Sequence, residues 1–127
     1  MKLWVDDVRP APDGYIWCKS VNEAIKVIQI CEQRIEKHMR GAEKAFRERD
    51  YDEKNHRYAL ANRFDITLID IDHDAGDYAN DGGDYIKLLD WLEETGRNYP
   101  IRIHSMNPVG RENMRRIIQR NGWTEVT

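Results

Sequence analysis

The sequence predicts a single α/β domain, residues 1–127, built on a parallel sheet of about five strands with helices on both faces. Short apolar runs that suit strands alternate along the chain with longer amphipathic runs that suit helices, and this alternation favours a parallel sheet. A length of 127 residues is typical of one domain and is enough for a hydrophobic core. No repeat, low-complexity segment or linker divides the chain.

The N-terminal part supplies two predicted strands. Lys2–Val5 is a short apolar run that stops at Asp6-Asp7, and Tyr15–Cys18 is a second run of aromatic and β-branched character. Residues 9–14 lie between them and contain two prolines and a glycine, which break regular structure. This segment is therefore predicted to be a loop.

A long helical segment follows. Ser20 and Glu23 fit a capping box at its start, and apolar residues then recur at spacings of three and four as far as Phe46. This stripe is longer than the usual globular helix of about 10–14 residues. Residues 50–62 are polar and predict a turn and a returning helix, so that residues 30–63 form a helical arm. Because a compact sheet cannot cover so long a stripe, we predict that the arm mediates self-association into a homo-oligomer.

The C-terminal half continues the alternation of strands and helices. Residues 66–71 form an almost wholly apolar run that suits a central parallel strand. A loop rich in Asp and Gly follows, then an amphipathic helix at 84–94 and a strand at 101–105. Residues 107–110 open a further helix at 111–120, which Asn121-Gly122 ends. Residues 123–126 predict a short final strand.

Composition excludes several classes of function. The chain has 20 basic and 23 acidic side chains, and a net charge of −3 gives no global positive field for duplex DNA. Acids at positions 6 and 7 argue against a signal peptide, and no segment approaches the roughly 20 apolar residues of a membrane span. Cys18 and Cys31 lack metal-binding spacing, so we expect reduced, buried thiols in a cytoplasmic protein.

Acidic side chains gather where the predicted strands end. Because ligands of open parallel sheets bind at the carboxyl ends of the strands, these residues are expected to share one crevice. Carboxylates so close together stay ionised only if a cation neutralises them, and oxygen ligands favour Mg²⁺, Mn²⁺ or Ca²⁺. The alternative is that each acid solvates a loop or caps a helix. The candidate metal ligands are Asp6, Asp7, Asp70, Asp72 and Asp74.

Other polar residues at the same strand ends suit phosphate chemistry. His73 and His104, with Asp72, are candidates for acid–base catalysis, although a loop histidine is more often structural. The helix that begins after Asn107 offers free amides to a phosphate, unless it is an ordinary turn with a proline near the helix start. The candidate phosphate-binding residues are Ser105, Asn107, Arg111 and Arg9. The remaining arginines of the last helix are interpreted as a solvated face.

Several of these motifs carry a resemblance to known families. Residues 64–70 resemble the third strand of response-regulator receiver domains, Asp6-Asp7 match their acidic pair, and Ser105 falls where receivers carry Ser or Thr. A closer resemblance, to cyclic-phosphate processing receiver-like domains, lies in residues 3–10, 72–74 and 104–110. It implies a receiver-like, flavodoxin-like fold and a role on cyclic phosphates of RNA ends or nucleotides. The resemblance leaves out the arm at residues 30–63, which it implies to be an insertion.

The chain also departs from ordinary receivers. Residues 123–127 contain no Lys, whereas receivers carry a Lys after strand five. We also expect no attached output domain. Both departures argue against a role in a phosphorelay. The alignment of strand three can shift by two residues, so that either Asp70 or Asp72 holds the central aspartate position.

Three functions remain in competition at this point. The leading one is a metal-dependent phosphoesterase acting on a cyclic phosphate or cyclic nucleotide, with Mg²⁺ or Mn²⁺ bound by the aspartates and protons moved by a histidine. A metal-free variant would pair His73 and His104 as acid and base. The second is a non-enzymatic binder that sequesters a nucleotide signal or an RNA end. The third is a stand-alone receiver phosphorylated on Asp70 or Asp72.

Overall fold

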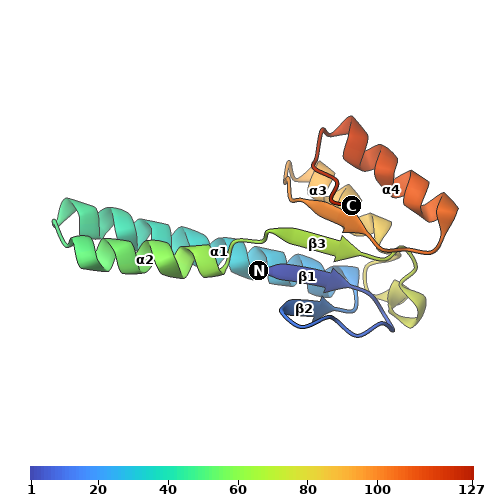
Figure 1. Ribbon diagram of the computed structural model, residues 1–127, viewed down its shortest axis with the longest axis horizontal. Helices are drawn as coiled ribbons and strands as arrows, with labels where there is room; N and C mark the ends of the chain where they lie inside the picture. Colours follow the sequence, from blue (N-terminus) through green and yellow to red (C-terminus); the bar gives the residue numbers. More distant parts are fainter.

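A computed structural model describes all 127 residues, and its centre is a four-stranded parallel sheet with the order β2-β1-β3-β4 (Figure 1). Four α-helices and one short 3₁₀ helix connect and extend the strands. In chain order the elements are β1 (Lys2–Val5), β2 (Tyr15–Cys18), α1 (Val21–Arg47), α2 (Tyr51–Arg63), β3 (Leu68–Ile71), η1 (Gly76–Asn80), α3 (Ile86–Glu94), β4 (Ile101–Ile103) and α4 (Pro108–Arg120).

The strand register brings the functional segments to one edge of the sheet. Val5 pairs with Cys18 on one side and with Ile71 on the other, and Ile71 pairs with Ile103. These pairs are the last residues of their strands, so β1, β3 and β4 end at the same level. The segments that follow, from residues 6, 72 and 104, therefore leave the sheet side by side.

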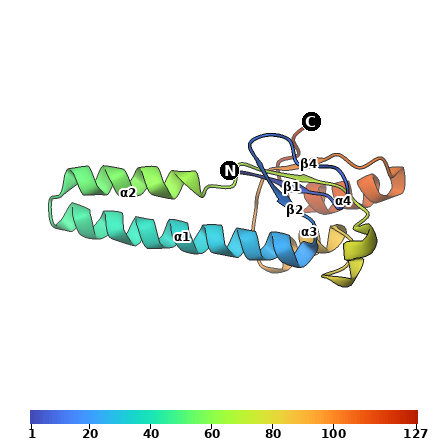
Figure 2. The ribbon, with the colours of Figure 1, turned by 90° about the horizontal axis from the view of Figure 1, so that it is seen from below.

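All the helices that pack on the sheet lie on one face, so the prediction of helices on both faces was wrong (Figure 2). The crossovers from β2 to β3, from β3 to β4 and from β4 to residue 125 run in the same direction across the sheet. When right-handed crossovers all run in the same direction across a sheet, their helices lie on the same face of it. A helix on the other face would have to come from the β1–β2 connection, which is the proline-containing loop.

The two faces of the sheet accordingly differ in composition. The helix-covered face carries the hydrophobic core, in which strand residues such as Leu3 and Ile69 pack against helix residues such as Leu89 and Met114. The opposite face presents the alternate strand residues, which are largely aromatic or charged. They are Lys2, Trp4, Tyr15, Trp17, Leu68, Asp70 and Arg102. The β1–β2 loop crosses this face and accepts the indole N–H of Trp4 at the carbonyl of Arg9, 2.9 Å away.

The predicted fifth strand is reduced to a single bridge. Ile101 donates its amide to the carbonyl of Thr124 and accepts the amide of Val126, and these two bonds form one parallel bridge with Glu125. Pairing goes no further because β4 itself has only three residues. The third and fourth strands are also shorter than predicted, since β3 begins at Leu68 and β4 ends at Ile103.

Helices α1 and α2 form an antiparallel hairpin that projects well beyond the sheet (Figures 1 and 2). Helix α2 returns along α1, and the two bury small side chains between them, Ala42 and Ala45 from α1 and Ala61 from α2. The returning helix predicted after residue 50 is present as α2; that residues 30–63 are an inserted arm stays a prediction. No helix of the chain is both long and apolar enough to cross a membrane.

Self-association of the hairpin also stays a prediction. Large apolar side chains remain exposed along it, among them Met39, Phe46 and Tyr51, which are 43%, 57% and 52% exposed. Light scattering at increasing concentration is expected to show a species heavier than the monomer. Replacing Phe46 and Tyr51 with serine should return the mass to that of a monomer, and a wild-type protein that stays monomeric at high concentration would contradict the prediction.

Candidate functional site

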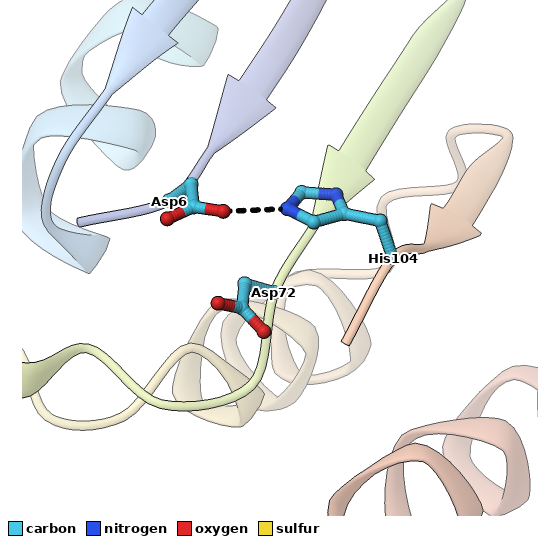
Figure 3. A group of neighbouring side chains, drawn as sticks. All are labelled: Asp6, Asp72 and His104. Atoms are coloured by element: carbon cyan, nitrogen blue, oxygen red, sulfur yellow. Dashed lines mark hydrogen bonds and ion pairs between the residues drawn. The ribbon is translucent and has the colours of Figure 1, made fainter. Parts of the chain in front are cut away.

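Three side chains from three strand ends converge at the carboxyl edge of the sheet (Figure 3). Asp6 follows β1, Asp72 follows β3 and His104 follows β4, and one ligand atom of each lies within 4.8 Å of the other two. Asp6 is fully buried, whereas Asp72 and His104 are partly exposed. The parallel register is what brings together residues almost a hundred positions apart in the chain.

His104 is held between two carboxylates. Its Nε2 lies 2.9 Å from Oδ2 of Asp6, and its Nδ1 lies 2.7 Å from Oδ1 of Asp70. The imidazole also stacks on the ring of Trp4, with the ring centroids 3.9 Å apart and the planes inclined by 3°. A carboxylate can only accept hydrogen bonds, so both contacts are satisfied when both ring nitrogens carry a proton. The surroundings therefore favour the imidazolium form.

The pKa values of this pair respond to the same contacts. Burial alone would lower the pKa of His104, but hydrogen bonds to Asp70 and Asp6 and the charges of both carboxylates outweigh it and raise that pKa. Burial alone would raise the pKa of Asp6, but the backbone amides of Arg9 and Val8, together with His104, outweigh it and lower that pKa. Both amides lie 3.0 Å from Oδ1 of Asp6. Near pH 6 the pair is thus an ion pair.

Asp7 lies in an unfavourable electrostatic environment. Its pKa is raised, first by burial and then by the neighbouring carboxylates of Asp6 and Asp72. The carboxylate packs so tightly against Gly76 that a side chain at that position would overlap it. A hard divalent cation would relieve this repulsion, and carboxylate oxygens are the ligands it prefers.

The residues at this edge include oxygen donors that could hold such a cation. Asp72 offers a carboxylate oxygen within 4.8 Å of Asp6, and the charges of both act on the neighbouring Asp7. Asp6 already accepts two amides and His104 and has one lone-pair position to spare. Asp70 was also a candidate ligand, but it is only 2% exposed. Its carboxylate accepts the Nδ1–H of His104, on the opposite side of the ring from Asp6. Its geometry suits orientation of the imidazole. Because Val5 pairs with Ile71, Asp72 rather than Asp70 leaves the sheet level with Asp6.

The candidate phosphate-binding residues lie around the start of α4. Ser105 is buried, and its Oγ accepts the amide of Asn107 at 3.1 Å, which leaves the hydroxyl proton free to donate. Asn107 caps the helix through its side-chain oxygen, which accepts the amide of Gly110. Arg111 donates from one guanidinium nitrogen to the carbonyl of Ser105 at 3.0 Å. A pocket of about 390 Å³ opens here, lined by Ser105, Met106, Pro108, Arg111 and Arg115.

The remaining candidates surround the same edge. Arg9 donates to the carbonyl of His104 at 3.3 Å, which ties the β1–β2 loop to the end of β4. His73 lies against the first turn of α4, and its Nδ1 is 2.9 Å from Oδ1 of the exposed Asp74. Asp72 accepts the amide of His73 at 2.8 Å. Asp74 is not part of the three-residue cluster and contacts His73 instead.

Gly110 sets the position of His73. A side chain at residue 110 would overlap the imidazole ring of His73. The ring can therefore pack against this turn of α4 only because residue 110 is a glycine. Gly110→Ala is expected to cost about 1–3 kcal/mol of stability through overpacking and to shift the ring resonances of His73 in NMR spectra. Gly41→Ala is the matched control, because Gly41 also lies within a helix and meets only the flexible Arg57 side chain.

A Gly110→Ala variant that unfolds like the wild type, with unchanged His73 resonances, would contradict this account. In the control, alanine should be neutral or stabilising by up to about 1 kcal/mol, since glycine is a poor helix former.

Sequence reasoning missed two residues of the site, Trp4 and Arg115, and one residue beside it, Arg102. Trp4 supports His104 by stacking, and the outward position of Trp4 in β1 gave no sign of this contact. Arg115 was assigned to a solvated face, yet it lines the pocket beside Ser105. Arg102 lies in a second pocket next to His104. The available signal for Arg102 was its position between two buried isoleucines of β4, which points it away from the core.

Comparison with known proteins agrees with this geometry. A family model described as the cyclic-phosphate processing receiver domain matches residues 1–39 and 40–120. Comparison with curated proteins and with solved structures found no match. The family match includes every residue of the site and both helices of the hairpin. The parallel sheet, its strand order and the acidic edge are consistent with a receiver-like fold. The chain therefore belongs to the family of cyclic-phosphate processing receiver domains.

Proposed function

We propose that this receiver-like domain, whose family is involved in cyclic-phosphate processing, is a metal-dependent phosphoesterase that hydrolyses a cyclic phosphate or a cyclic nucleotide. The observation that carries the proposal is the position of His104. Buried Asp70 contacts Nδ1 of its ring, Asp6 contacts Nε2, and a carboxylate oxygen of Asp72 lies within 4.8 Å of both Asp6 and His104. The next residue in the chain, Ser105, already lines a pocket with two arginines. An oriented acid–base group, a set of cation ligands and an anion pocket thus adjoin one another.

Each group has a role in the proposed hydrolysis. A bound Mg²⁺ or Mn²⁺ would polarise the phosphoryl group and lower the pKa of a water molecule. Asp7 and Asp72 hold the cation, while Ser105 and Arg111 bind the phosphate oxygens through hydrogen bonds and charge. Asn107 contributes by fixing the first turn of α4 below the phosphate.

Two histidines would act as the general acid and the general base. Water adds to phosphorus as one ring P–O bond breaks, and the released sugar oxygen needs a proton. His104, kept protonated by Asp70 and Asp6, supplies that proton. His73, with its ring against α4 and its Nδ1 beside Asp74, takes the proton from the attacking water. The product is a phosphate monoester with a free hydroxyl group.

Turnover of a nucleoside 2′,3′-cyclic phosphate with Mg²⁺ tests the proposal. Asp72→Asn should reduce the rate by about 10²-fold or more, the scale of losing an essential group of the site. Asp77→Asn is the control, since Asp77 is an exposed residue of η1 in the same loop and lies outside the cluster of Asp6, Asp72 and His104. Equal rates for the two variants would contradict the assignment of Asp72.

One observation favours a second function, the binding of a cyclic nucleotide or RNA end without hydrolysis. Both ring nitrogens of His104 are engaged by carboxylates, the ring is stacked on Trp4, and the side chain is only 11% exposed. Such a histidine is rigid, and proton transfer to a ligand would have to break the contact with Asp6. Wild-type protein that binds the cyclic nucleotide and never cleaves it, with or without cation, would establish this second function.

A further inference from the structure

Two pockets share a wall at the edge of β4. The first, of about 390 Å³, is the one beside Ser105. The second, of about 340 Å³, lies on the other side of Arg111 and Arg115 and reaches His104. Its lining comes from β4, α4 and the C-terminal segment, and consists of Arg102, Ile103, His104, Arg111, Arg115, Glu125, Val126 and Thr127.

The second pocket has an excess of arginine side chains. Glu125 is its acidic side chain, and Arg115 binds it through two parallel contacts of 3.0 Å, so these two charges offset each other. Arg111 makes a hydrogen bond to a carbonyl and keeps its charge uncompensated. Arg102 is about half exposed, and its one ion pair, with Asp70, is 4.0 Å long. Arg102 and Arg111 therefore present two positive charges to this pocket.

We infer that the second pocket binds a second phosphate group of the ligand, with Arg102 as its principal contact. The inference rests on the proposed function, because the first pocket is taken to hold the cyclic phosphate. Arginine is well suited to an oxyanion, since its planar guanidinium can donate two hydrogen bonds at once. Arg111 and Arg115 line both pockets, so a ligand that fills both carries two phosphates on neighbouring positions.

Two ligand sources supply that chemistry. The second phosphate is either a 5′-phosphate on the nucleoside that carries the cyclic phosphate, or the phosphodiester that joins it to a preceding nucleotide. We favour the phosphodiester, because the pocket opens between β4 and the C-terminal segment and is large enough for a phosphate with part of its sugar. The preferred ligand is then an oligonucleotide end.

Calorimetric titration compares three ligands: adenosine 2′,3′-cyclic phosphate, its 5′-phosphorylated form, and an adenosine dinucleotide ending in a 2′,3′-cyclic phosphate. The dissociation constant of each ligand is measured by titration in EDTA. In Mg²⁺, the Michaelis constants of the same three ligands are compared. The dinucleotide should bind at least about tenfold more tightly than the mononucleotide. Arg102→Ala should remove most of that advantage and leave the affinity for the mononucleotide within about twofold. Arg116→Ala is the control, because Arg116 is 67% exposed, pairs with Glu112 and lines neither pocket.

Equal affinity for the three ligands, or no binding of any, overturns the inference. So does an Arg102→Ala variant that loses affinity for mononucleotide and dinucleotide alike, which would mean that Arg102 acts through Asp70 and His104. If the 5′-phosphorylated nucleotide alone gains affinity, the second phosphate is confirmed and its source is a terminal 5′-phosphate monoester rather than a phosphodiester. Failure of the proposed hydrolysis leaves a different signature, because the affinity ratio is measured in EDTA whether or not any ligand is cleaved.

Discussion

Replacing His104 with alanine is expected to reduce the free energy of unfolding by about 3–5 kcal/mol at pH 6. The imidazolium lies between Asp6 and Asp70, which are 0% and 2% exposed. Removing one member of a buried charged set leaves the others without a partner, and this is among the most destabilising single changes. The loss of stacking on Trp4 adds to the effect. Urea unfolding curves of wild type and variant measure it directly.

The effect should depend on pH in a defined way. The pKa of His104 is raised, so its stabilising contribution is complete below the unfolded value near 6.5 and declines as pH rises through the folded value. The pKa of Asp6 is lowered, so its contribution is complete above the unfolded value near 4 and declines as pH falls through the folded value. The difference in stability between wild type and His104→Ala should therefore be largest between about pH 5 and 6.

His73→Ala provides the matched control for this experiment. His73 lies at the same edge of the sheet, but its ring contacts only the exposed Asp74 by hydrogen bonding. Its loss should cost no more than about 1 kcal/mol. A His104→Ala variant as stable as His73→Ala at pH 6 would show that the two buried carboxylates do not depend on the imidazole.

Asp7→Asn is expected to raise the melting temperature of the metal-free protein and to abolish any rise caused by Mg²⁺ or Mn²⁺. The raised pKa of Asp7 means that its ionisation is disfavoured in the fold, so stability falls as pH rises through that pKa. Removing one of several like charges in contact should gain about 1 kcal/mol, the scale of two charges near 4 Å in water. For a chain of this size the gain corresponds to about 3–5 °C.

The control for this variant is Asp13→Asn, in the exposed part of the β1–β2 loop. It should leave both the apo melting temperature and its response to cations unchanged. If millimolar Mg²⁺, Mn²⁺ and Ca²⁺ all fail to shift the wild-type melting curve, the carboxylate cluster does not hold a cation and the metal-dependent proposal fails.

Much of this arrangement could be predicted from the sequence because it depends on local patterns. The apolar runs ending at Val5 and at Ile71, and the parallel sheet implied by the alternation, were enough to place the acids at one edge. A last helix opened by residues 107–110 was likewise predicted, although it begins at Pro108 rather than at residue 111. These features need only residue type and spacing along the chain.

Other features depend on strand order, which spacing along the chain does not determine. The order β2-β1-β3-β4 makes every helical crossover run one way, and this leaves the second face without helices. Asp70 and His104 are 34 residues apart in the chain, and their contact requires both side chains to lie on that second face. For the same reason the stacking of His104 on Trp4 and the pocket at Arg102 could be found only in the folded chain.

A ³¹P NMR time course of wild-type protein with a nucleoside 2′,3′-cyclic phosphate tests the proposed hydrolysis most directly. The cyclic resonance should convert to that of a monoester in the presence of Mg²⁺, stop converting when EDTA is added, and resume when Mg²⁺ is restored. Asp72→Asn should convert it at least about 10²-fold more slowly. A cyclic resonance that broadens on binding but never converts, at any cation concentration, would contradict hydrolysis and leave a protein that binds cyclic phosphates without cleaving them.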